Sequence, residues 1–295
     1  MNDWYQRVVG ILQLNGKGEL TQQAYARSVR MLCEFYDKTP DLISEAELRE
    51  YFLHRKNVNH WSPKTMRIGY YGIRFFYLNV LERNWHILSI LRAQTEHRLP
   101  AVLSVEEVRS ILAHVKTLHN HVYLSTLYSC GLRLHEGLHL EVCDIDSQRM
   151  MIHVHRGKGA KDRYVALPQS TLHLLRQYWR THRHPHLLFP ALGRNGKGAK
   201  DAQGPMAKSS VQGAFQRAKG EARVRKKGVS IHTLRHCYAT HLLEAGVNLR
   251  VIQRYMGHAH LQTTTLYLHL TQKGQQDACQ LINHVMEGLD HDLHP

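Results

Sequence analysis

Long apolar runs, paired cysteines and acidic residues are all scarce in this chain of 295 residues. It has no stretch of about 18 apolar residues, so we expect no membrane-spanning helix. The first 14 residues lack the pattern of a signal peptide, which predicts a cytoplasmic protein. The five cysteines are odd in number and form no Cys-x-x-Cys pair. A disulfide framework is therefore not expected, and reduced, mostly buried thiols are the simpler interpretation.

The shortage of acidic residues leaves a net charge of +15, from 39 Lys and Arg against 24 Asp and Glu. Residues 1–92 carry 13 basic against 9 acidic residues, and the remainder carries 26 against 15. Two basic regions suit a protein that holds a polyanion such as DNA between two lobes. Composition alone fits a basic soluble surface equally well. Membrane-surface binding is less favoured, because no basic amphipathic helix with an aromatic face is present.

Residues 1–92 predict a helical domain. Apolar residues recur at helical spacing over 24–35, and Ser44 to Glu47 form a capping box that opens a further helix. Ser62 and Pro63 then supply an N-cap and a first-turn proline for a helix over 64–81. We interpret the five aromatic residues of that helix as core rather than as a base-stacking surface. Three basic residues beside them are candidate phosphate contacts: Lys64, Arg67 and Arg74.

A linker is predicted over 93–99, where the sequence is polar and lacks periodic apolar residues. Pro100 follows it, and the capping box from Ser104 to Glu107 opens a second domain, 100–295. Alternating segments at 151–155 and 163–167 predict a β-hairpin, and helical patterns return later. The expected fold is mainly α with a small β-sheet. The second domain would be α+β.

Two glycine-rich basic loops lie in this second domain. The segment 193–205 predicts a mobile loop, and its glycine spacing does not match a phosphate-binding loop, so nucleotide binding is rejected. Its Lys197 and Lys200, with Lys161 of the hairpin loop, are further candidate DNA contacts.

Four short segments of the second domain contain chemically useful residues. They are Gly131 to Glu136 on a predicted helical apolar run, Lys158 at the hairpin tip, His232 to His236, and Gly257-His258 followed by Tyr267. Breaking a phosphodiester without a metal requires cations against the transition state, a nucleophile and a proton donor for the leaving oxygen. Arg133 and Arg235 supply bidentate donors, Tyr267 a hydroxyl, and a lysine on a glycine loop a proton. Glu136 is placed either to hold Arg133 or to orient a histidine.

Each of these features is weak alone. An Arg/Glu pair three residues apart is usually an exposed ion pair, Gly-Lys-Gly is usually a turn, and a tyrosine near a helix usually packs. Their order and spacing are far more specific. Intervals of 25 residues from Arg133 to Lys158, 26 from His232 to His258 and 9 from His258 to Tyr267 occur together with the strings LPAVLS, GKGAKDR and HTLRHCYATHLL.

This set resembles the signature of the tyrosine recombinase family, also called the lambda-type phage integrase family, with Xer-like, integron-like and mobile-element members. The likeness is strong over residues 98–272 and covers the N-terminal helices only in outline. It implies a SAM-like core-binding domain in residues 1–92 and an α+β catalytic domain with a C-terminal tail helix that docks on a neighbouring subunit. The two domains would together form a C-shaped DNA clamp. Apolar spacing over 278–289 suits such a helix, in cis or in trans.

The resemblance also implies roles for individual residues. Tyr267 would attack DNA and form a 3′-phosphotyrosyl link, and Arg133, Arg235 and His258 would stabilise the transition state. Lys158 would protonate the leaving 5′ oxygen, His232 would assist proton transfer, and Glu136 would be the acidic support. No metal or nucleotide cofactor is implied, because the covalent link conserves the bond energy. The implied partner is duplex DNA with a specific recombination site, bound by a homotetramer on paired sites through a Holliday junction.

The resemblance suggests a bacterial nucleoid-associated protein that acts in integration, excision or resolution. A second recombinase or an accessory protein remains possible. Three alternatives stay open: a metal-dependent enzyme, in view of the clustered histidines at 182–186 and the His232/His236 pair; a type IB topoisomerase-like enzyme that relaxes DNA; and a non-catalytic DNA-binding protein.

Overall fold

The computed structural model describes residues 3–90, 99–155, 162–193 and 198–270, with side chains to 268. The chain divides into two compact units, Met1–Arg98 and Leu99–Pro295. Lys158, Lys161, Lys197 and the predicted tail helix lie outside the described residues. In the described part of the chain no helix is long and apolar enough to cross a membrane.

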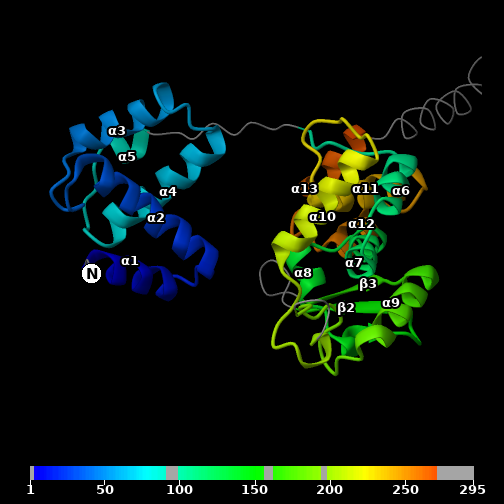
Figure 1. The fold of residues 1–295 in the computed structure, drawn as a ribbon. Helices are drawn as coiled ribbons and strands as arrows, with labels where there is room; N and C mark the ends of the chain where they lie inside the picture. Colours follow the sequence, from blue (N-terminus) through cyan, green and yellow to red (C-terminus); the bar gives the residue numbers. More distant parts are fainter. Residues whose placement is uncertain (1–2, 91–98, 156–161, 194–197, 271–295) are drawn as a thin grey trace, which may run out of the picture. The chain divides into compact units, whose positions relative to one another are not determined.

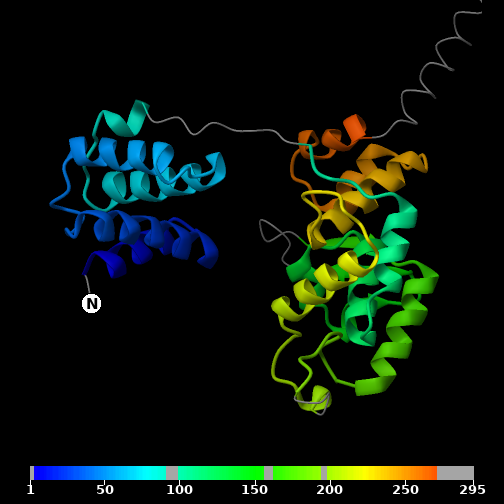
Figure 2. The ribbon, with the colours of Figure 1, turned by 45° about the horizontal axis from the view of Figure 1, so that its top comes forward.

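The first unit is helical, and its long helices run side by side (Figures 1 and 2). Its helices are α1 (Asp3–Leu14), α2 (Glu19–Tyr36), α3 (Glu45–Asn57), α4 (Pro63–Asn79) and α5 (Ile87–Ile90). The predicted starts of two helices are confirmed. Ser44 forms a capping box with Glu47, and Ser62 accepts a hydrogen bond from the backbone N–H of Thr65. Such caps typically contribute about 1 kcal/mol each.

The aromatic residues of α4 mostly form the core of this unit, as predicted. Tyr70, Phe76 and Tyr77 are buried, whereas Tyr71 is 45% exposed. The basic residues of the same helix, Lys64, Arg67 and Arg74, lie on its exposed side. The Arg74 guanidinium donates a hydrogen bond to Tyr70 Oη, at 3.1 Å. The exposed side of α4 is therefore basic, and its buried side is aromatic.

In the second unit, helices and a small sheet pack around one large hydrophobic core. Its elements before the sheet are α6 (Val105–Ala113), α7 (Leu118–Cys130), α8 (Leu134–Leu138) and the 3₁₀ turn η1 (Val142–Asp144). After the sheet come α9 (Gln169–His182), η3 (Ala199–Asp201), α10 (Lys208–Glu221), α11 (Ile231–Glu244), α12 (Leu249–Met256), α13 (Gln262–Thr265) and η4 (Leu266–Leu270). The capping box at Ser104 that opens α6 is confirmed.

The sheet has three antiparallel strands in the order β1-β2-β3. The predicted hairpin strands are β2 (Met151–Val154) and β3 (Arg163–Ala166), and a two-residue strand, β1 (Ile145–Asp146), was not predicted. Ile152 and Val154 of β2 are buried in the core, so the alternate positions of β2 face away from it.

Two expectations about loops and cysteines need adjustment. The described part of the predicted mobile loop is anchored, since Ala191 N donates to Gly204 O and Ala199 is buried, while Lys200 is exposed. Of the four described cysteines, none is in a disulfide. Cys130 and Cys237 are buried as expected, whereas Cys143 is exposed.

Candidate active site

A glycine turn between α7 and α8 places the first catalytic candidate. Gly131 has φ of +61°, and a Cβ at this position would come within 2.3 Å of Tyr238 Cδ1, so only glycine fits. Arg133 follows as the N-cap of α8. The prediction that Gly131 to Glu136 sits on a helical run is therefore wrong for Gly131 to Arg133, because the left-handed glycine ends α7, whereas Leu134 to Glu136 do lie in a helix, α8.

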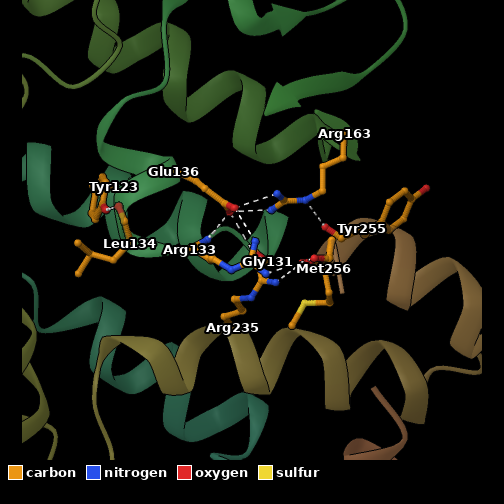
Figure 3. A network of polar contacts seen from close by, with 10 residues as sticks. Tyr123, Gly131, Arg133, Leu134, Glu136, Arg163, Arg235, Tyr255 and Met256 are labelled. Carbon is orange, nitrogen blue, oxygen red and sulfur yellow. Dashed lines mark hydrogen bonds and ion pairs between the residues drawn. The ribbon is translucent and has the colours of Figure 1, made fainter. Parts of the chain in front are cut away.

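One carboxylate, that of Glu136, organises the site (Figure 3). Its Oε1 accepts from Arg133 Nη1 at 2.7 Å, and its Oε2 accepts from the Arg133 backbone N–H at 2.8 Å. Arg163 of β3 binds the same carboxylate bidentately, at 2.8 and 2.6 Å. Arg235 Nη1 lies 3.7 Å from Oε2. Glu136 thus holds Arg133, as the sequence suggested, and no contact with a histidine is seen for it among the described residues.

Backbone carbonyls fix the same three guanidinium groups from the other side (Figure 3). Arg235 donates to the carbonyls of Gly131 and Met256, Arg163 Nε donates to Tyr255 O at 2.8 Å, and Arg133 Nη2 donates to Gly257 O at 3.3 Å. Gly257 has φ of +58°, and a Cβ there would come within 2.8 Å of Arg163 Cδ. The C-terminal turn of α12 therefore forms one wall of the arginine cluster.

The charges of this cluster are retained at neutral pH. Burial opposes ionisation of Glu136 and would raise its pKa. The hydrogen bonds and charge of Arg163, together with the hydrogen bonds of Arg133, outweigh this effect and lower the carboxyl pKa to about 2. Burial, followed by the charge of Arg133, lowers the pKa of Arg235 to about 9, so this guanidinium stays protonated at pH 7. Three cations around one anion leave a net positive site.

A change of Glu136 to glutamine should therefore remove an acid-sensitive part of the stability. Because the folded pKa is depressed, this stabilisation is present above the unfolded pKa and is lost as the pH falls through the folded value of about 2. Between about pH 5 and pH 2 the wild type should lose roughly 3 kcal/mol more unfolding free energy than E136Q. Urea unfolding of both proteins across that range measures the difference, and parallel pH profiles would contradict the prediction.

A pocket of about 570 Å³ opens beside the arginine cluster. It is lined by Arg133, His232, Arg235, His236, Gly257, His258, Ala259, His260, Thr263, Leu266 and Tyr267. The Tyr267 ring, carried by η4, is only 2% exposed. The folded chain therefore brings both predicted arginines, both predicted histidines and the predicted tyrosine to one concave surface.

The hydroxyl of Tyr267 is held by a histidine that the sequence analysis did not assign to the site. Tyr267 Oη lies 3.0 Å from His236 Nδ1. His258 stacks against the tyrosine ring, with centroids 6.4 Å apart, and its own Nδ1 lies 2.9 Å from Thr264 Oγ1. His236, Arg163 and Thr264 are the site residues that were missed. Arg163 and His236 stand inside the strings GKGAKDR and HTLRHCYATHLL, so their positions had been noted but their roles had not.

The protonation states follow from burial and from the arginines. Burial raises the pKa of Tyr267 to about 12, although the charges of Arg235 and Arg133 oppose the shift. Burial and the charge of Arg235 lower the pKa of His258 to about 3, and burial with the charge of His232 lowers that of His236 to about 4. At pH 7 the pocket therefore contains a neutral phenol and the neutral imidazoles of His236 and His258 beside permanent guanidinium cations.

The histidine cluster at 182–186 has a structural explanation. His184 Nδ1 accepts hydrogen bonds from the backbone N–H groups of His186 and Leu187, and His184 Nε2 lies 3.0 Å from Ala202 O. Both nitrogens of this ring are thus occupied by the backbone, and the ring fastens the turn after α9 to residue 202.

Comparison of the sequence with family models agrees with this geometry. Residues 101–273 match the phage integrase family, and residues 4–87 match the N-terminal SAM-like domain of phage integrases. The chain belongs to the phage integrase family. A putative integrase/recombinase of Sinorhizobium fredii is 38% identical over 266 residues, covering 90% of this chain and 83% of the relative. A tyrosine recombinase of Thermosipho africanus is 30% identical over 272 residues, covering 88% and 92%.

Solved structures show the same fold at low identity. A lambda integrase tetramer bound to a Holliday junction matches with a TM-score of 0.72 at 14% identity, covering 90% of this chain and 76% of that one. The XerH site-specific recombinase bound to its palindromic difH substrate matches with a TM-score of 0.70 at 21% identity, covering 91% and 81%. This phage integrase family member is thus mainly α with a small antiparallel sheet, as the sequence predicted.

Proposed function

We propose that this integrase-family chain is a site-specific DNA recombinase that cleaves and rejoins strands through a covalent bond from Tyr267 to a DNA phosphate. The observation that carries the proposal is that Arg133, Arg235 and Tyr267 line one pocket. Two fixed guanidinium groups next to a hydroxyl are what attack on a phosphodiester requires, since negative charge accumulates on the non-bridging oxygens.

In the proposed reaction, Tyr267 Oη attacks the phosphorus and the bond to the 5′ oxygen breaks. The product is a 3′-phosphotyrosyl link with a free 5′ hydroxyl. Arg133 and Arg235 bind the non-bridging oxygens, while His232 and His258, which are neutral, donate hydrogen bonds. Lys158 of the hairpin loop gives a proton to the leaving oxygen. Attack by a 5′ hydroxyl on the phosphotyrosine reverses these steps, so no nucleotide or metal cofactor enters the balance.

The phenol proton needs an acceptor, because a pKa of about 12 keeps Tyr267 protonated at pH 7. His236 is neutral at that pH and already lies 3.0 Å from the hydroxyl oxygen. We therefore assign it the role of holding this hydroxyl. The negative charge of a bound phosphate would raise the pKa of the imidazole, so that it takes the proton as the phosphorus–oxygen bond forms.

Two substitutions test the hydrogen bond and the basicity of His236 separately. H236L should slow single-turnover cleavage by roughly 100-fold, the usual effect of losing a general base, without loss of DNA affinity. H236N keeps a polar group near the position of Nδ1 but has no basic nitrogen, so it should hold the hydroxyl and still cleave about as slowly as H236L. A wild-type rate for H236L or for H236N would contradict the role of proton acceptor.

The exposed cations of the first unit are the proposed phosphate contacts. Neutralising Lys64 and Arg67 together should weaken DNA binding and reduce the slope of log K against log salt by about two, since each phosphate contact contributes about 0.9. R30Q is a suitable control, because exposed Arg30 already pairs with Glu34 at 3.5 Å. A salt slope that stays unchanged in the double variant would exclude these contacts. Exposed Arg74 and Lys200 remain proposed DNA contacts on the same reasoning. Lys161 and Lys197, which lie outside the described residues, remain proposed contacts from their glycine-rich basic setting in the sequence.

Several parts of the proposal concern the assembly. The first unit would act as the core-binding domain, joined by a linker at 93–99 to the catalytic domain, and the two would close as a C-shaped clamp on duplex DNA. A homotetramer would act on two paired sites through a Holliday junction, with the tail segment docked either in cis or on a neighbouring subunit. The protein would then work on the bacterial nucleoid, with or without a second recombinase or accessory protein.

The test is incubation with suicide DNA substrates that carry a nick near the scissile phosphate. The expected result is a covalent protein–DNA adduct, formed in the presence of EDTA, whose DNA-linked peptide contains Tyr267. Sequencing the trapped junctions would give the site. Plasmid relaxation without joining of two sites would instead favour the topoisomerase-like alternative, and binding without any adduct would favour a non-catalytic protein.

A further inference from the structure

A second cluster of chemically active side chains lies on the sheet, outside the pocket of Tyr267. The antiparallel register pairs Ile145 with Ile152 on β1 and β2, and His153 with Tyr164 on β2 and β3. One step along the same register brings Asp144 beside His153. Because side chains alternate along a strand, His153 and His155 project from the same face, opposite to buried Ile152.

The donor atoms of this cluster lie close enough to share one ion. One atom each from Asp144, His153 and His155 all fall within 4.8 Å of one another. Asp144 Oδ1 lies 2.6 Å from His155 Nε2, and the Oδ2 of Asp162 lies 3.4 Å from His153 Nε2. Donors bound to one tetrahedral zinc ion are about 3.3 Å apart, so small rotations of the two imidazoles would accommodate it.

Asp144 is the residue that indicates a ligand. It is 3% exposed, and its Oδ2 accepts a hydrogen bond from the Glu141 backbone N–H at 2.8 Å. The other oxygen, Oδ1, is buried and has no hydrogen bond of acceptable geometry within the described ranges, although it points at His155. A buried carboxylate oxygen without a hydrogen bond is costly unless a cation completes it.

We propose that Asp144, His153 and His155 bind a single divalent transition-metal ion, with zinc as the ion that the donors fit best. Two imidazole nitrogens and one carboxylate suit zinc, whereas magnesium and calcium prefer oxygen ligands alone. Water completes the coordination, and Asp162 adds negative charge beside it. Stacking of His153 on Tyr164, with centroids 4.6 Å apart, holds one of the two rings in place.

The ion would have a structural role and would take no part in strand cleavage. It would join the turn before β1 to the end of β2. In the sequence, Lys158 follows His155 by three residues and precedes Asp162 by four. The bound ion would therefore fasten the strand from which the Lys158 segment begins.

The alternative is a purely ionic cluster, in which a protonated His155 sits between the carboxylates of Asp144 and Asp162. Such a cluster binds no metal, and protons and metal compete for the same imidazoles. Metal binding by the full-length protein therefore distinguishes the two.

The experiment titrates metal-free protein, prepared by dialysis against EDTA, with Co²⁺ as a spectroscopic probe and then with Zn²⁺. The expected result is one Co²⁺ per chain with a visible d–d band, displacement of Co²⁺ by Zn²⁺, and a rise in melting temperature with Zn²⁺. H153Q/H155Q should weaken binding by on the order of 100-fold and abolish the rise.

Surface histidines are numerous, so a matched control is needed. His135 and His139 form an exposed, stacked pair on α8 with centroids 6.2 Å apart, and H135Q/H139Q should bind Co²⁺ as the wild type does. Equal melting temperatures of H153Q/H155Q and wild type in EDTA would show that the variant folds. Wild type that binds no Co²⁺, unchanged binding by H153Q/H155Q, or loss of binding in H135Q/H139Q would each overturn the proposal. None of these readouts depends on recombination.

Discussion

Replacing Tyr267 with phenylalanine is expected to abolish the covalent protein–DNA adduct. The substitution removes one oxygen and keeps the ring that stacks on His258, so the pocket should hold its shape. Only the hydroxyl that we propose as the nucleophile is lost, and no other hydroxyl of the described residues shares the hydrogen bond to His236. DNA affinity should change by less than about twofold, since phosphate contacts dominate binding.

Suicide substrates and a gel-shift titration on the same preparation measure these two quantities. Y255F is a matched control, because it removes the same atom from a tyrosine that does not line the pocket. An adduct formed by Y267F at the wild-type level would show that another residue is the nucleophile. Loss of both the adduct and DNA binding would mean that the variant is misfolded, which a thermal melt would reveal.

Replacing Arg133 with alanine should reduce single-turnover cleavage by on the order of 10³-fold, or about 4 kcal/mol of transition-state stabilisation. Arg133 is the better choice than Arg235, because its side chain is 23% exposed whereas that of Arg235 is 3% exposed. After R133A, Glu136 still has its bidentate partner Arg163, so the fold should persist.

The charge and the geometry of Arg133 can be separated with a second variant. R133K keeps the charge but cannot donate bidentately, so its rate should lie between those of R133A and the wild type. A loss of less than about tenfold in R133A, with an unchanged melting temperature, would show that Arg133 does not contact the reacting phosphate.

Local chemistry was sufficient to predict several element boundaries. The helix starts at Ser44, Ser62 and Ser104 depend on hydrogen bonds within four residues, and such signals are complete in the sequence. The turn at Gly131 was missed for the opposite reason. Apolar spacing continues through it and resembles a single helix, while the close approach of Tyr238 that demands glycine comes from 107 residues further along.

The sequence predicted those site residues that belong to ordered motifs and missed those that depend on tertiary contacts. Arg133, Arg235, His258 and Tyr267 were found through order and spacing, and the pocket contains all four. Arg163 was missed because a lone arginine in a strand normally faces solvent. Its function follows only once the β-hairpin folds back and carries it to Glu136, 27 residues away. The register of the hairpin creates this contact, and short-range periodicity carries no information about it.

The position of Tyr267 within the pocket of its own chain has a genetic consequence. Tyr267, Arg133 and Arg235 line one pocket of a single chain, so in the proposed reaction each protomer supplies its own nucleophile and arginines. When Y267F and R133A subunits are mixed, neither can lend the other the group it lacks, and complementation should fail at every ratio. In a cell that holds the wild-type allele beside either variant, the defective subunits would occupy positions in the assembly without contributing a cut, and each variant allele would act as a dominant inhibitor.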